Sequence, residues 1–94
     1  MDEAKKQYLI DSLFKKDSRW IDNLWENGYY YQPGRTKPFI EMTKKEVLWR
    51  LNGYEGCTTL NTSHALYPYF LLRIELTDEE WDMIKMQLIL MREI

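Results

Sequence analysis

Cys57 and His64 are the residues of this chain whose types could form a nucleophile and a general base. Asn61 or Asn52 could then act as the third group that orients the base. A reactive thiol requires electropositive surroundings, and the acidic residue Glu55 is close to it in the sequence. We therefore expect an ordinary loop cysteine, a loop histidine that caps a backbone group, and no enzymatic activity. A Cys57/His64 hydrolase is the minor alternative.

The sequence also argues against bound metals and cofactors. His64 is the only histidine, which excludes a site with several histidine ligands. Residues Gly53-Tyr54-Glu55-Gly56 resemble the Gly-x-x-Gly loop of RNA-binding domains, but that loop contacts phosphates and should be basic. Glu79 and Glu80 are neighbours in a first helical turn and would not face each other as a catalytic pair. We expect no metal and no organic cofactor.

Aromatic and basic residues surround a predicted turn at Pro33-Gly34. Tyrosine rings beside a guanidinium can stack on a nucleobase and hold a phosphate, or they can contact a protein. The simplest alternative is an ordinary hairpin with partly buried tyrosines. The candidate partner- or ligand-binding residues here are Tyr29, Tyr30, Tyr31, Arg35 and Lys37.

The last predicted helix, after Thr77, has two apolar stripes at helical spacing. Packing against a core requires only one of them, formed by Trp81, Ile84, Leu88 and Met91. The second stripe consists of Met83, Met86, Leu90 and Ile94. It is covered either by the first helix of the same chain or by a partner, and we expect a homodimer interface.

Composition limits the classes of partner. The 94 residues carry 13 basic and 15 acidic side chains and a net charge of −2, which disfavours binding to duplex DNA. Hydrophobic residues make up 45% and aromatic residues 15% of the chain, so it should fold. A single cysteine, no apparent signal peptide and no apolar stretch of about 20 residues predict a cytoplasmic protein outside the membrane.

Two stretches, at 40–46 and 74–80, share the pattern Ile-Glu-apolar-Thr-x-x-Glu. Each predicts a capping box and a hydrophobic staple at the point where a strand leads into a helix. Further helices are predicted at 3–15 and at 17–27, and strands at 29–31, 37–42 and 69–76. In the alternative, part of 64–72 is helical with Pro68 in the first turn. We therefore predict one α+β domain over 1–94, with about four helices and a two- to three-stranded antiparallel sheet.

The expected function is binding rather than catalysis. Many aromatic residues and no catalytic constellation in the sequence favour a non-enzymatic interaction protein that binds and modulates a macromolecular partner. Inhibition is the expected effect, for instance by a protein of a phage or other mobile element acting on a host defence enzyme. The alternative is a small oligomeric protein that sequesters a nucleotide or another small ligand with Tyr, Trp and Arg side chains.

Overall fold

The computed structural model describes residues 1–26, 28–32, 35–53 and 59–93. The predicted α+β class is wrong, because the protein is mostly helical. Within these ranges the five α-helices are α1 (Glu3–Lys15), α2 (Ser18–Glu26), α3 (Lys44–Asn52), α4 (Tyr67–Glu75) and α5 (Asp78–Glu93). A two-stranded antiparallel hairpin of β1 (Gly28–Gln32) and β2 (Arg35–Pro38) is the extent of strand pairing in the described ranges.

Both predicted capping boxes are present. The Thr43 hydroxyl accepts from the Glu46 N–H at 3.3 Å, and the Glu46 carboxylate accepts from the Thr43 N–H at 3.0 Å. Thr77 and Glu80 repeat this exchange at 3.1 and 3.0 Å. Because each box satisfies two N–H groups that a helix start leaves without partners, α3 and α5 begin where the sequence predicts.

The predicted strand at 69–76 is instead helix α4. Alternate apolar residues suggested a strand, but the buried side chains follow helical spacing, at Tyr69, Phe70, Leu72 and Arg73. Pro68 lies in the first turn, where its missing N–H costs no helical hydrogen bond. A run of apolar residues this dense is compatible with the alternation of a strand and with the spacing of a helix. The packing of one helical face against the core selects the helix.

The predicted second strand is shorter than expected. β2 ends at Pro38 and is followed by a 3₁₀ turn, η1 (Phe39–Glu41), instead of continuing to Met42. Pro38 has no N–H to extend the ladder. Phe39 and Ile40 are consecutive and both fully buried, whereas a strand would send them to opposite faces. The turn therefore places both side chains in the core.

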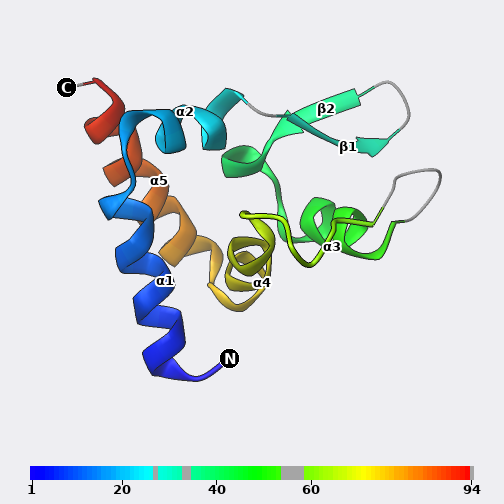
Figure 1. Ribbon diagram of the computed structural model, residues 1–94, viewed down its shortest axis with the longest axis horizontal. Coiled ribbons are helices and arrows are strands. Elements are labelled where there is room, and N and C mark those ends of the chain that lie inside the picture. The colour runs from blue at the N-terminus through cyan, green and yellow to red at the C-terminus, as the bar shows by residue number, and fades with distance from the viewer. Residues whose placement is uncertain (27, 33–34, 54–58, 94) are drawn as a thin grey trace.

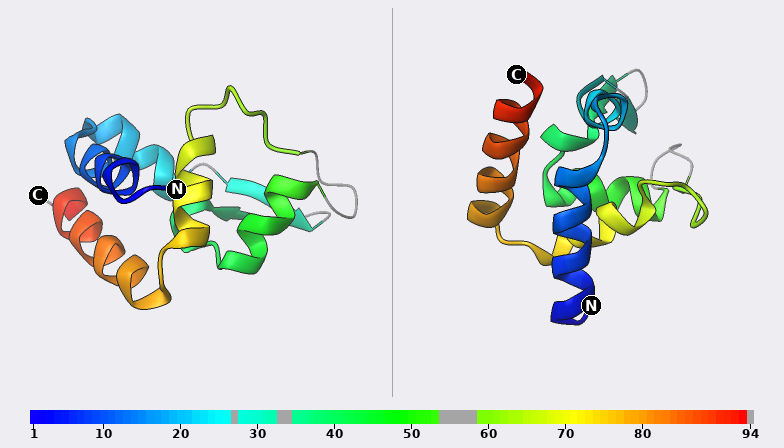
Figure 2. Two further views of the ribbon diagram at one scale, coloured as in Figure 1. Left: turned by 90° about the horizontal axis from the view of Figure 1, so that it is seen from below. Right: turned by 60° about the vertical axis from the view of Figure 1, so that its left-hand side comes forward.

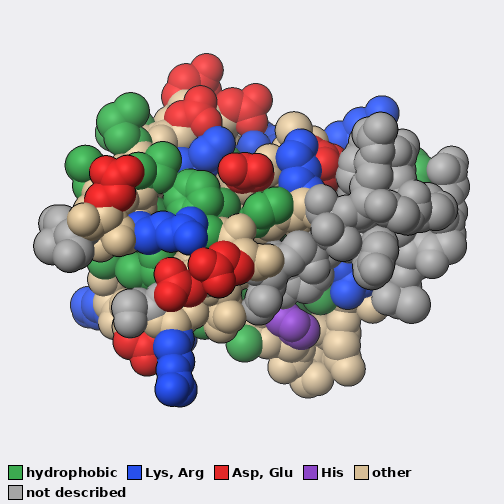
Figure 3. Space-filling model, turned by 90° about the horizontal axis from the view of Figure 1, so that it is seen from above, with side chains coloured by type: hydrophobic (Ala, Val, Ile, Leu, Met, Phe, Trp, Pro, Cys, Tyr) green, Lys and Arg blue, Asp and Glu red, His purple; other side chains and the backbone are tan. Residues whose placement is uncertain are grey.

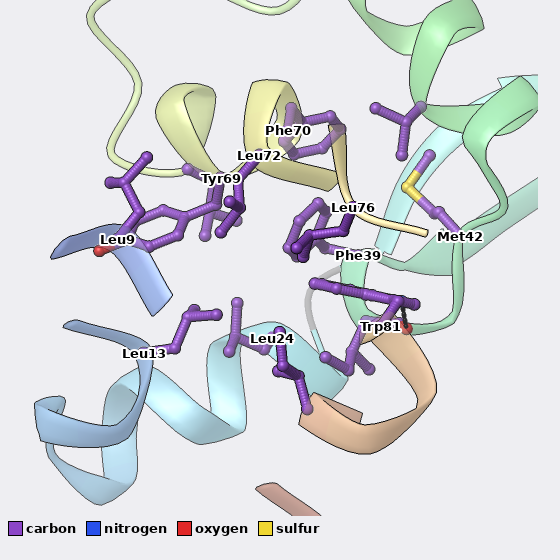
Figure 4. Close-up of a cluster of buried hydrophobic side chains, with 14 of the residues drawn as sticks. Leu9, Leu13, Leu24, Phe39, Met42, Tyr69, Phe70, Leu72, Leu76 and Trp81 are labelled. Carbon is purple, nitrogen blue, oxygen red and sulfur yellow. Dashed lines mark hydrogen bonds between the residues drawn. The ribbon is translucent and has the colours of Figure 1, made fainter. Parts of the chain in front are cut away.

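Phe39 lies at the centre of that core (Figure 4). Its ring centroid is 4.5 Å from that of Phe70 and 5.6 Å from that of Trp81. Helices α1 and α2 contribute Leu13 and Leu24, which are fully buried in the same cluster.

Helix α4 lies between two groups of elements at opposite ends of the molecule. Helices α1, α2 and α5 form one end of the molecule, and the hairpin and α3 form the other (Figure 1). Helix α4 lies between α1 and α3 and contacts both, and α5 packs against α2 (Figure 2). One face of α5 therefore remains at the surface.

Candidate functional site on the C-terminal helix

The N-terminal half of α5 is fixed in the core. Its first turn is held by the Thr77–Glu80 capping box. One turn later, the buried Trp81 indole donates from Nε1 to the carbonyl oxygen of Ile40 at 3.2 Å. The Arg73 guanidinium lies 5.1 Å from the centroid of the Trp81 ring and donates to Asp78 at 3.1 Å. These contacts fix the direction in which the exposed side of α5 faces.

The C-terminal half of α5 is tied to α2. Arg92 donates from Nη2 to Glu26 at 3.2 Å, and its Nε lies 3.9 Å from Asp22. Its guanidinium also lies 5.5 Å from the centroid of the Trp25 ring. These groups are partly exposed, so each pair contributes little, but together they hold the last turns against α2.

The two predicted stripes of α5 have opposite environments. Trp81, Ile84 and Leu88 are buried, as the first stripe predicts. In the second stripe the exposed fraction is 66% for Met83, 65% for Met86 and 58% for Leu90. Helix α1 thus leaves most of this stripe uncovered, contrary to the alternative that assigned it to the core of a single chain. Ile94 lies outside the described residues.

A shallow groove separates this stripe from α1. It has a volume of about 190 Å³, with Glu80 and Gln87 at its polar edge. Its apolar lining comes from both helices and from the segment between α4 and α5, and comprises Ile10, Phe14, Leu76, Met83 and Ile84. Met83 belongs both to the stripe and to the groove, so the two form one continuous apolar surface. We call this surface, formed by Met83, Met86, Leu90, Ile10 and Phe14, the α5 face.

Acidic side chains border the α5 face. Glu79, Asp82 and Glu93 are exposed and lie within one or two helical turns of Met86 on the same side of α5. Figure 3 shows hydrophobic and acidic side chains adjoining at the left-hand end of the molecule. Of the basic residues of α5, Arg92 pairs with α2, and Lys85 lies 4.0 Å from Asp82, one of these acids.

Glu80, at the edge of the groove, is held in its ionised form. The Thr77 N–H donates to its carboxylate and lowers its pKa, with a smaller contribution from Lys6, whose Nζ lies 3.5 Å away. Lys6 is thus the basic side chain of α1 that reaches the groove, and it is already paired.

The hairpin residues proposed as a binding site are only partly described. Tyr29 pairs with Lys37 and Tyr30 with Thr36 in the backbone ladder, with an irregularity before the Gln32–Arg35 pair. The side chains of Tyr29, Tyr30, Tyr31 and Arg35 lie outside the described part of the structure. Their role in binding stays a prediction.

Lys37, the remaining residue of that set, has a structural partner. Its Nζ donates to the buried carboxylate of Glu46 at 2.9 Å, which links β2 to α3. Burial alone would raise the pKa of Glu46, but the hydrogen bonds from Lys37 and Thr43 and the charge of Lys37 outweigh it and lower the pKa. A ligand at the hairpin would compete with this ion pair for the ammonium group.

Cys57 lies outside the described residues, so its role stays a prediction. His64 is exposed, and its Nδ1 accepts from the Leu66 N–H at 3.1 Å, which is the expected backbone cap. Across the described ranges, no three His, Cys, Asp or Glu side chains are grouped as metal ligands would be. Nor does any helix within those ranges have the length and apolarity needed to cross a bilayer.

Comparison with known proteins yields no match: no family model, no curated protein and no solved structure is similar to this chain.

Sequence reasoning identified the exposed stripe of α5 but missed the contribution of α1. Ile10 and Phe14 belong to the apolar side of the predicted helix at 3–15, and both are partly exposed at the groove. The available signal was their position, because they lie one turn apart at the edge of the apolar side formed by Leu9 and Leu13. Residues at the edge of such a stripe are the ones most often left at a surface.

Proposed function

We propose that this chain is a non-enzymatic, cytoplasmic protein-binding module that binds and inhibits one macromolecular partner through the α5 face. One observation carries the proposal. Met83, Met86 and Leu90 are more than half exposed on one side of a helix whose opposite side is anchored in the core. As an example of such inhibition, we predict that a protein of a phage or other mobile element acts on a host defence enzyme.

The energetics support binding at this surface. Leaving a large apolar side chain in water forfeits roughly 1.5–3 kcal/mol relative to full burial. Contiguous apolar surface rimmed by polar residues is typical of sites where proteins interact. Methionine adds adaptability, since its unbranched side chain and polarisable sulfur fit irregular partner surfaces.

The rigidity of α5 supports the same proposal. The helix is held by its capping box, by Trp81 and by Arg92, so it is already ordered before a partner arrives. Binding to an ordered surface costs less conformational entropy than binding to a loop.

A site-specific photocrosslinker tests the proposal. A benzophenone amino acid is placed at Met86 and, as a matched control, at Leu48, an exposed apolar residue of α3 whose exposed fraction is 42%. Irradiation of cells that express each variant should give a discrete adduct from position 86 and none from position 48. Adducts from both positions, or from neither, would contradict the proposal.

The mass of the adduct separates the remaining alternatives. An adduct of twice the chain mass would support the predicted homodimer, and a different mass would identify another protein. The nucleotide-binding alternative depends on Tyr29, Tyr30, Tyr31 and Arg35, and a rise in melting temperature with added nucleotides would support it.

A further inference from the structure

We infer that the partner segment that fits the α5 face is an amphipathic helix with lysine or arginine residues beside its apolar stripe. This inference rests on the function proposed above and specifies the chemistry of the partner.

The size of the groove points to side chains rather than to a small ligand. Sites that enclose drug-sized molecules have volumes of about 300–1,000 Å³. The groove between α1 and α5 has about 190 Å³ and an apolar lining, so it accommodates one or two apolar side chains. It continues onto the exposed ridge of Met83, Met86 and Leu90, which extends over two turns of α5. Apolar residues spaced three and four apart on a partner helix match a groove and ridge of this kind.

The charges around the surface specify the flanks of that helix. Glu79, Asp82 and Glu93 are exposed beside the ridge, and on α1 Glu3 is exposed on the side of Ile10 and Phe14. Lys6 is paired with Glu80 and Lys85 lies 4.0 Å from Asp82. The border along α5 is therefore acidic, and complementary potentials favour a basic partner.

The same charges disfavour a second copy of this chain. In a twofold dimer the same surface lies on both sides of the interface. The acidic border of one copy would then lie across from the acidic border of the other, and like charges across an interface oppose association. The predicted homodimer is thus the competing occupant of this surface.

Two synthetic peptides test the inference. Both have leucine at the same helical positions, and the remaining positions are lysine in one peptide and glutamate in the other. Fluorescence anisotropy should give a dissociation constant at least about tenfold lower for the lysine peptide, and the difference should shrink as salt screens the charges.

Three variants locate the binding. Glu79→Gln with Asp82→Asn and Glu93→Gln should weaken lysine-peptide binding roughly tenfold, since three favourable charges are removed. Met83→Gln with Met86→Gln should weaken it without changing the salt dependence. Leu48→Gln with Leu71→Gln alters exposed apolar residues away from the α5 face and should leave binding unchanged.

Equal affinity for the two peptides would overturn the inference. So would an equal loss of peptide binding in the α5-face variants and in the Leu48→Gln with Leu71→Gln control. The third contrary result is a wild type that sediments as a dimer and becomes a monomer on Met83→Gln with Met86→Gln. If position 86 still crosslinks to another protein, only the basic helix is wrong. Absence of that crosslink contradicts the proposed function itself.

Discussion

The indole Nε1 of Trp81 donates to the carbonyl oxygen of Ile40 at 3.2 Å, and both residues are buried. This hydrogen bond joins the first turns of α5 to the 3₁₀ turn after the hairpin, two segments far apart in the sequence. It satisfies a buried carbonyl group, which would otherwise lose its hydration without a replacement.

Trp81→Phe should lower the free energy of unfolding by about 1–3 kcal/mol, because it keeps an aromatic ring but leaves the Ile40 carbonyl without this donor. Trp81→Ala should cost about 3–5 kcal/mol, since a cavity is added. Urea unfolding followed by circular dichroism measures both. A Trp81→Phe variant as stable as the wild type would show that the hydrogen bond contributes nothing.

Removal of either helix cap should destabilise the protein. Thr43→Ala and Thr77→Ala should each lower the free energy of unfolding by about 0.5–2 kcal/mol, with an unchanged slope against denaturant. Thr62→Ala, at an exposed position between α3 and α4, is the matched control and should stay within about 0.5 kcal/mol of the wild type. Wild-type midpoints for both cap variants would show that the caps are not stabilising.

The Lys37–Glu46 pair should make stability depend on pH. Because the pKa of Glu46 is lower in the folded chain than in the unfolded chain, its ionised form stabilises the fold. That contribution is fully present above the unfolded value of about 4.3 and is lost as the pH falls through the lower folded value. Urea midpoints measured at steps below about pH 5 should therefore decline.

Lys37→Met is the variant that isolates this effect. At neutral pH it should cost about 1–3 kcal/mol, because the buried Glu46 carboxylate loses its charged donor. The difference from the wild type should shrink in acid, where Glu46 is protonated in both proteins. A constant difference across this range would assign the cost to the lysine stem and not to the ion pair.

Substitutions on the α5 face should spare the fold. Met86→Glu with Leu90→Lys alters two exposed side chains, so the free energy of unfolding should change by less than about 1 kcal/mol. Leu88→Lys, on the buried side of the same helix, is the contrasting variant and should unfold the chain. Unfolding of the double variant would mean that this face belongs to the core.

Helix starts were predictable because their signals are local. Thr43 and Thr77 with their partner glutamates fix where α3 and α5 begin, and the structure shows that Asp2 caps α1. Gly53 ends α3 in the left-handed conformation, which glycine adopts without steric cost. Such patterns depend on side chains within a few residues of one another, so no tertiary information is required.

The errors arose where tertiary packing decides the backbone conformation. The apolar run of α4 fits a strand or a helix, and contact with α1 and α3 selects the helix. The turn at Phe39 and Ile40 forms because Trp81 and Phe70 surround it, and both are distant in sequence. The sequence predicts the exposed ridge of α5, because its last helix has a second apolar stripe that the core does not require. The groove beside the ridge depends on where α1 packs, which is a tertiary contact.

The exposure of two methionines also gives the α5 face a chemistry of its own. Peroxide converts a thioether to a sulfoxide, which is polar and chiral, and the reaction follows solvent access. Met83 and Met86 are about two-thirds exposed, whereas Met42 is 1% exposed in the core. Mild oxidation should therefore modify the surface methionines while the fold stays intact, so that an oxidant weakens binding at this face and a sulfoxide reductase restores it.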